Sequence, residues 1–243
     1  MSGSTVTLTA APALTTRSVV LSLLLGAHPG RLPARDLVAM GEEFGVAPAT
    51  TRVTLSRLVA ARDLVNDGAT YSLSERHLRR QAAQDEALAP RVGPYDGSWT
   101  VLVVTATGRD AASRAGLRAD LRRWRLAELR EGVWMRPANV ATPVADDGLV
   151  TLRSYPDDDR ALVAQLWDLD AWVATADELL AAADPSGPLR DRFVANAAIV
   201  RHLRADPLLP TELRPDRWPA DHLRSVYDDF RSELTALRTE EKT

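Results

Sequence analysis

The stretch FGVAPATTRVTLSRLVAARDLVNDGATYSLSERHL, residues 44–78, decides the fold of the N-terminal part of the chain. Gly45 favours the end of one helix, because glycine readily adopts the left-handed conformation that follows a helix. Pro48 favours the start of the next helix, because its missing amide N–H has no partner in a first turn. Residues 64–74 then form two runs of β-favouring residues around the turn at residues 66–69, which predicts a β-hairpin. The stretch therefore predicts a helix-turn-helix followed directly by a hairpin.

The helix predicted from Pro48 to about Arg62 has two different faces. At 100° per residue, Leu55 and Leu58 fall on one side, as a stripe that faces a core requires. The opposite side carries short polar residues and arginine, the combination that contacts base edges and phosphates in the DNA major groove. We therefore expect DNA contacts from this helix and from the hairpin tip. The candidate residues are Thr50, Thr51, Arg52, Thr54, Arg57, Asn66 and Thr70.

Helical patterns flank this stretch on both sides. Residues 18–25 form a nearly all-apolar run, and residues 34–44 and 75–88 also follow helical patterns. Three helices, a tight turn and a hairpin make up a winged helix-turn-helix, which we place at residues 17–89. Residues 1–16 carry no charged side chain and are rich in Thr, Ser and Ala, so we expect a disordered tail there.

The middle of the chain predicts a small α/β domain. Residues 99–106 read as a strand, 111–123 as a helix, 126–135 as a strand pair and 149–155 as a further strand. This order suits a ferredoxin-like sheet at residues 95–157.

The last part of the chain has a helical pattern. Helices are expected at residues 160–183, 189–204 and 220–237, with a proline-rich elbow at 206–219 before the last of them. We assign residues 158–243 to a helical C-terminal domain. The predicted fold class is α+β.

Composition excludes several classes of protein. The chain has no cysteine, which excludes disulfides and thiol catalysis, and its four histidines are scattered, so no metal site and no cofactor are expected. No apolar run is long enough to cross a membrane, and a cytoplasmic protein is expected. The net charge is −3, yet residues 17–80 hold nine arginines against six acidic residues. A basic N-terminal segment followed by an acidic remainder of the chain is typical of a DNA-binding module joined to another domain.

Motifs spread over nearly the whole chain carry a family resemblance. They are the Gly45-Val46 start followed by Arg52, Ser56, Arg57 and Leu58, then YDGSWTVLVV, REGVWMRPAN, LWDLDAW and DPLLPTELRPDRWP. Together these motifs resemble the PaaX family of transcriptional repressors, although Tyr95 stands where the family often has Trp and Ala220 where it usually has Gly. The resemblance implies a homodimer that binds near-palindromic operator DNA and is released by an acyl-CoA thioester, phenylacetyl-CoA in the namesake. It also implies a central domain similar to Cas2 proteins.

A receptor for an acyl-CoA thioester needs arginines for its phosphates and aromatic or apolar groups for its other parts. Residues 109–136 hold eight arginines against four acidic residues and include two of the six tryptophans. We therefore expect the effector there. The candidate effector contacts are Arg118, Arg122, Trp124, Trp134 and Arg136.

Three alternatives compete with an acyl-CoA-controlled repressor. An enzyme is disfavoured, because the sequence has no phosphate loop, nucleophile elbow or zinc-protease motif. A Cas2-like nuclease would need an acidic residue at the end of the first sheet strand to hold a metal ion, but Asp110 lies beyond that position, in the following turn. A winged helix can also serve as a docking surface for another protein. A repressor with a different ligand, or with none, remains open as well.

Overall fold

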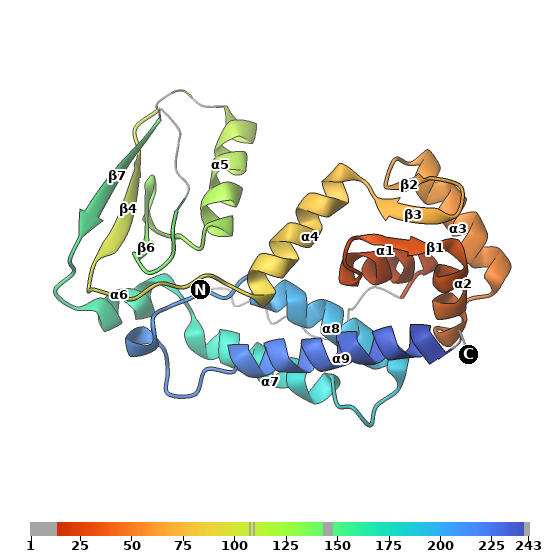
Figure 1. The fold of residues 1–243 in the computed structure, drawn as a ribbon. Helices are drawn as coiled ribbons and strands as arrows, with labels where there is room; N and C mark the ends of the chain where they lie inside the picture. Colours follow the sequence, from red (N-terminus) through yellow and green to blue (C-terminus); the bar gives the residue numbers. More distant parts are fainter. Residues whose placement is uncertain (1–13, 107, 109, 143–147, 241–243) are drawn as a thin grey trace. The chain divides into compact units, whose positions relative to one another are not determined.

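The computed structural model describes residues 14–106, 108, 110–142 and 148–240. The chain forms two compact units. The first, here called the N-terminal unit, comprises the described parts of residues 1–88, 177–201 and 221–243. The second, here called the central unit, comprises those of residues 89–176 and 202–220 (Figure 1).

The N-terminal unit contains the predicted winged helix-turn-helix. Its elements are α1 (Thr16–Gly26), β1 (Arg31–Pro33), α2 (Ala34–Glu43), α3 (Pro48–Ala60), β2 (Leu64–Asn66), β3 (Thr70–Leu73) and α4 (Glu75–Leu88). The strands form an antiparallel sheet in the order β1-β3-β2. The hairpin is confirmed, and β1 is a third strand that the sequence patterns did not predict. Residues 1–13 of the predicted disordered tail lie outside the described residues, whereas Thr15 caps α1 through its side chain and Thr16 begins the helix.

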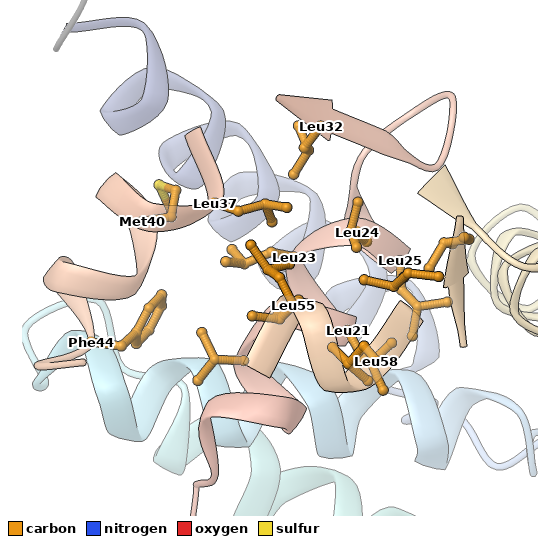
Figure 2. Close-up of a cluster of buried hydrophobic side chains, with 14 of the residues drawn as sticks. Leu21, Leu23, Leu24, Leu25, Leu32, Leu37, Met40, Phe44, Leu55 and Leu58 are labelled. Carbon is orange, nitrogen blue, oxygen red and sulfur yellow. The ribbon is translucent and has the colours of Figure 1, made fainter. Parts of the chain in front are cut away.

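The core of this unit explains why α3 takes its place. Leu24 of α1, Leu37 of α2 and Leu55 and Leu58 of α3 are at most 1% exposed and belong to one cluster. Figure 2 shows labelled side chains of this cluster from the three helices and from β1 pointing toward one another. Burial of each such side chain stabilises the fold by about 1.5–3 kcal/mol, so the apolar stripe holds one face of α3 inward.

Two helices from the end of the chain share this core. They are α8 (Leu189–Leu203) and α9 (Ala220–Glu240). Phe193 of α8 and Phe230 of α9 are 5% exposed and belong to the same cluster as the winged-helix leucines. The ring of Phe193 lies 4.6 Å from that of Phe44, measured between centroids, and 6.3 Å from that of Phe230. The N-terminal unit is therefore built from both ends of the sequence.

The central unit holds a four-stranded antiparallel sheet. Its elements are β4 (Trp99–Val104), α5 (Ala111–Arg123), β5 (Ala127–Arg130), β6 (Val133–Pro137) and β7 (Leu149–Ser154). The strand order β5-β6-β4-β7 is that of a ferredoxin-like sheet, which confirms the prediction. Leu102 and Trp134 belong to one buried cluster with Leu121 of α5, while Trp99 and Met135 belong to another cluster on the other face of the sheet. The alternation of side chains along each strand thus covers both faces of the sheet.

The second face of the sheet is covered by α6 (Asp159–Leu166) and by the proline-rich elbow. The single helix predicted at residues 160–183 is wrong, because α6 ends before Trp167 and α7 (Leu169–Ala182) follows. The side chain of Asp168 accepts a hydrogen bond from the backbone N–H of Ala171, so it caps a new helix. The helices predicted at 189–204 and 220–237 correspond to α8 and α9.

The predicted C-terminal domain at residues 158–243 is divided between the two units. The elbow belongs to the central unit, where Trp172 stacks on Trp218 and on His202 with ring centroids 4.2 Å apart in both pairs. Leu209 of the elbow packs in the same cluster as Trp99. Helix α9 and most of α8 pack on the winged helix instead. Among the described residues, no helix is long and apolar enough to cross a membrane.

Candidate nucleic-acid interface

The turn between α2 and α3 sets the position of the candidate recognition helix. Gly45 has a φ of 72°, a left-handed conformation that glycine adopts without strain. Its N–H donates to the carbonyl oxygen of Glu42 at 2.8 Å, and the N–H of Val46 donates to that of Gly41 at 2.9 Å. Pro48 then begins α3 at its first position. The tight turn between the two predicted helices is confirmed.

One predicted DNA contact is corrected by the structure. Thr51 is 0% exposed, and a Cβ on Gly41 would lie 2.7 Å from its Oγ1. Thr51 therefore packs against α2 in the closest part of the helix-turn-helix and cannot reach a ligand. The helical periodicity explains this, because Thr51 precedes the buried Leu55 by one turn.

The other predicted residues of α3 lie on its open face or at the flank of that face. Thr50, Arg52 and Arg57 are exposed, and Thr54 is partly buried. Val53 lies among them with 49% of its surface exposed, although it was not among the predicted contacts. An exposed apolar side chain on such a face can pack against the methyl group of thymine. The face thus combines short hydroxyl side chains, one apolar side chain and the cation of Arg57, with Arg52 at its flank.

The arginines of this face differ from those around them. Arg17 and Arg76 both pair with Asp63, and Arg79 pairs with Glu75. Within the described part of the chain, Arg52 and Arg57 have no ion-pair partner. Arg57 on the open face and Arg52 at its flank are exposed and lack a counter-charge, which leaves a local positive potential that a phosphate can neutralise.

The hairpin tip is held by its own side chains. The Oδ1 atom of Asn66 accepts a hydrogen bond from the N–H of Gly68 at 2.8 Å, and Oδ1 of Asp67 accepts one from Thr70 at 2.9 Å. Arg31 of β1 lies 3.9 Å from a carboxylate oxygen of Asp67. The amide group of Asn66 still offers N–H donors, whereas the predicted contact Thr70 is partly buried. The tip is suited to a contact with the DNA backbone more than to reading bases.

A buried carboxylate joins α3 to its neighbours. Asp63, 1% exposed, follows α3 and forms ion pairs with Arg17 of α1 and Arg76 of α4. Its Oδ1 also lies 3.1 Å from Nε2 of His77, whose pKa is lowered below 6.5, chiefly by burial and further by nearby arginines. His77 is therefore neutral at pH 7 and donates to the carboxylate. Asp63 was not among the predicted site residues, because its partners lie 46 and 13 residues away.

Comparisons with known proteins agree with this architecture. The family model described as "PaaX-like protein" matches residues 15–77, and the one described as "PaaX protein central Cas2-like domain" matches residues 93–148. The solved structure of the uncharacterized protein Rv0674 from Mycobacterium tuberculosis is 43% identical in sequence. It superposes with a TM-score of 0.85 and covers 95% of this chain and 100% of its own. The chain belongs to the PaaX family of transcriptional regulators. No curated protein matches the chain.

The effector contacts predicted for this PaaX-family chain fall into two groups. Arg118 and Arg122 are exposed on α5, where Arg118 pairs with Glu128 at 3.2 Å. Trp124, at the end of α5, is partly buried. Trp134 is 2% exposed and is covered by Arg122, whose guanidinium carbon lies 5.8 Å from the ring centroid.

Arg136, the fifth predicted effector contact, is buried inside the central unit. It is 0% exposed and donates to the backbone oxygens of Pro137 at 3.0 Å and Trp124 at 2.9 Å. Burial lowers the pKa of Arg136 to about 10, so the side chain stays charged at pH 7. Trp134 and Arg136 are enclosed by protein and could reach an effector only after rearrangement. Among the described residues, no group of three or more His, Asp or Glu side chains could hold a metal ion.

Proposed function

We propose that this PaaX-family regulator is a DNA-binding repressor that reads its operator with α3. The observation that carries the proposal is the open face of α3, where Arg57 is exposed beside Thr50 and Thr54 and Arg52 is exposed at the flank. The helix is presented by a winged helix-turn-helix, in which the second helix enters the major groove.

The residues of this face suggest different roles. Arg57 lies near the middle of the exposed stripe, and we assign it to a guanine edge, since arginine donates two parallel hydrogen bonds to guanine O6 and N7. Arg52 lies five residues earlier, at the flank of this face, and is assigned to a phosphate. Thr50 and Thr54 have the short side chains that allow close approach to bases. A homodimer would place two such helices about 34 Å apart, or a multiple of that distance, on a near-palindromic site.

The regulatory part of the proposal concerns a ligand. We propose that binding of an acyl-CoA thioester favours a conformation of the cytoplasmic dimer with lower affinity for DNA, which relieves repression of a catabolic operon. A ligand shifts such an equilibrium only by its different affinities for the two conformations. The protein acts by binding and not by catalysis.

A DNA-binding titration tests the proposal. A labelled duplex is selected from a random pool by the full-length protein, and its affinity is measured by fluorescence anisotropy at several salt concentrations. Arg57→Ala should weaken binding by roughly tenfold or more and reduce sequence preference, because one base contact is worth about 1–3 kcal/mol. Arg52→Ala should weaken binding to all sequences and reduce the slope of log K against log salt by about 1.

The matched control is Arg79→Ala. Arg79 is an exposed arginine of the same unit, but it pairs with Glu75 on α4. Its replacement should leave the affinity within about twofold, as expected for a solvated surface ion pair. Equal effects at positions 57 and 79 would contradict the assignment of α3. Binding of a protein partner without any salt-dependent affinity for DNA would favour the docking-surface alternative.

A further inference from the structure

A pocket of about 500 Å³ lies inside the N-terminal unit. One wall comes from α1, β1, α2 and α4, and the other comes from α8 and α9. Pockets for small organic ligands usually measure about 300–1,000 Å³, so one organic molecule fits. The apolar part of the lining includes Leu23, Leu25, Leu32, Met40, Phe193 and Phe230.

Two buried amide oxygens at this pocket lack a partner. Asn196 is 2% exposed, and its Nδ2 donates to the carbonyl oxygen of Arg192 at 2.9 Å. Its Oδ1 is buried without a hydrogen bond, as is Oε1 of Gln84, among the residues that the structure describes. Buried polar atoms are almost always satisfied in folded proteins. A ligand with an N–H or O–H group would satisfy them.

The charged side chains in the lining itself are chiefly arginines, and acidic side chains lie beside it, as where Nε2 of His28 lies 3.0 Å from Oδ1 of Asp85. Arg80, Arg231 and Arg238 contribute to the lining, and no described aspartate or glutamate does. Arg231 also pairs with Asp228 at 3.1 Å, outside the lining. Burial raises the pKa of Tyr227, so its hydroxyl group stays protonated and can donate. The lining thus favours an anionic group on the ligand.

We infer that this pocket binds an amphipathic organic anion, with an apolar body, one acidic group and one N–H or O–H group. We further infer that its occupancy reaches α3. This second step rests on the proposed function, whereas binding does not. The site differs from the predicted effector contacts in residues 118–136.

Three aromatic rings connect the pocket to the helix-turn-helix. Phe193 and Phe230 line the pocket, and the ring of Phe193 lies tilted against that of Phe44 at the end of α2, with the centroids 4.6 Å apart. Phe44 precedes Gly45, the residue on which the turn into α3 depends. Close-packed side chains transmit a displacement to their neighbours, so a ligand that moves Phe193 also shifts the start of α3.

Binding is tested with 1-anilinonaphthalene-8-sulfonate, which has an aromatic body, an N–H and a sulfonate. The native full-length protein should bind one probe molecule saturably without change in its near-ultraviolet circular dichroism. Ala197→Trp places an indole at the pocket and should weaken binding by roughly tenfold or more through overpacking. Ala236→Trp is the matched control, because Ala236 is exposed on α9 and outside the lining. Equal affinities of the two variants would overturn the site.

Two further variants test the chemistry of the lining. Arg238→Gln should weaken binding of the sulfonate probe on the order of tenfold, but not that of uncharged N-phenyl-1-naphthylamine, because the latter forms no charge-assisted contact. Asn196→Leu should weaken binding of the sulfonate probe while thermal stability changes little, since loss of the hydrogen bond from Nδ2 to the carbonyl oxygen of Arg192 is offset by removal of the unpaired buried oxygen. A loss of stability with unchanged probe affinity would assign Asn196 a structural role and contradict the inference. Displacement of the probe by 4-hydroxyphenylacetate, which has an apolar ring, one carboxylate and one O–H group, would support the inferred ligand class, and displacement only by phenylacetyl-CoA would contradict the single acidic group.

The link to α3 is tested by repeating the DNA titration with saturating probe. The probe should lower the DNA affinity of the wild type but not that of Ala197→Trp. Phe44→Leu should bind the probe normally and lose the effect on DNA. Saturable probe binding without any DNA binding would refute the proposed function and leave the pocket standing. DNA binding that responds equally to the probe in the wild type and in Ala197→Trp would refute the pocket and leave the proposed function standing.

Discussion

Replacement of Arg136 by methionine separates a structural role from a ligand-binding role. The guanidinium group is buried and donates to the carbonyl oxygens of Trp124 and Pro137. Asp206, 1% exposed, favours its charged form. Methionine keeps much of the side-chain volume but leaves both carbonyl oxygens and the aspartate without this partner.

The expected magnitude follows from these contacts. A hydrogen bond from a charged donor contributes about 1.5–3 kcal/mol, and removal of one partner of a buried charge typically costs about 3–5 kcal/mol. We therefore expect Arg136→Met to lower the free energy of unfolding of the central unit by about 3–5 kcal/mol. For a unit of this size the Tm should fall by roughly 10–20 °C.

The assay uses urea unfolding followed by tryptophan fluorescence. All six tryptophans belong to the central unit, so the signal reports on that unit alone. Arg118→Met is the control, because Arg118 is an exposed arginine whose pair with Glu128 contributes at most about 1 kcal/mol. Wild-type stability of Arg136→Met, together with loss of the response to phenylacetyl-CoA, would refute the structural role and restore the effector assignment.

Three further predictions concern stability. Asp63→Asn should lower the free energy of unfolding of the N-terminal unit by about 2–4 kcal/mol, because two arginines lose a buried counter-charge. Urea titrations followed by circular dichroism measure this, and a change below about 0.5 kcal/mol would contradict it. Thr51→Val removes a buried hydroxyl group without a partner, so the free energy of unfolding should rise by about 1 kcal/mol. The affinity for DNA should stay unchanged, and a loss of that affinity would instead make Thr51 a DNA contact. Burial lowers the pKa values of His77 and His202 below 6.5, so their contribution to stability is complete above pH 6.5 and lost as the pH falls below it. Scanning calorimetry should show a lower Tm at pH 5.5 than at 7.5 and a smaller difference in His202→Gln.

Local patterns were enough to predict the winged helix and the sheet. The turn at Gly45, the proline that begins α3 and the hairpin each depend on residues close in sequence, and each is present. The two errors in this region have clear causes. Strand β1 is three residues long and pairs with β3 some forty residues later, which no short-range pattern reveals. Thr51 is a polar residue type, which suggested a DNA contact, but its position one turn before Leu55 places it on the buried face of α3.

The candidate effector region was predicted from composition, and composition does not distinguish exposed from buried arginine. Arg118 and Arg136 are 18 residues apart in an arginine-rich segment, yet Arg118 is solvated on α5 whereas Arg136 is a fully buried residue of strand β6. The pocket could not be predicted for a different reason. Its two walls come from segments more than a hundred residues apart, and only the tertiary fold brings them together.

The shared core gives this arrangement a mechanical consequence. Helices α8 and α9 supply Phe193 and Phe230 to the cluster that also holds Leu55 and Leu58 of α3. Because packed interiors deform little, the orientation of α3 depends on how these two distant helices pack. A change in the packing of α8 or α9 is therefore expected to alter the orientation of α3 without contacting its open face. If the pocket binds a ligand and α3 reads DNA as proposed, the core of the N-terminal unit itself connects the two sites, because Phe193 and Phe230 belong to both the pocket lining and the cluster around α3.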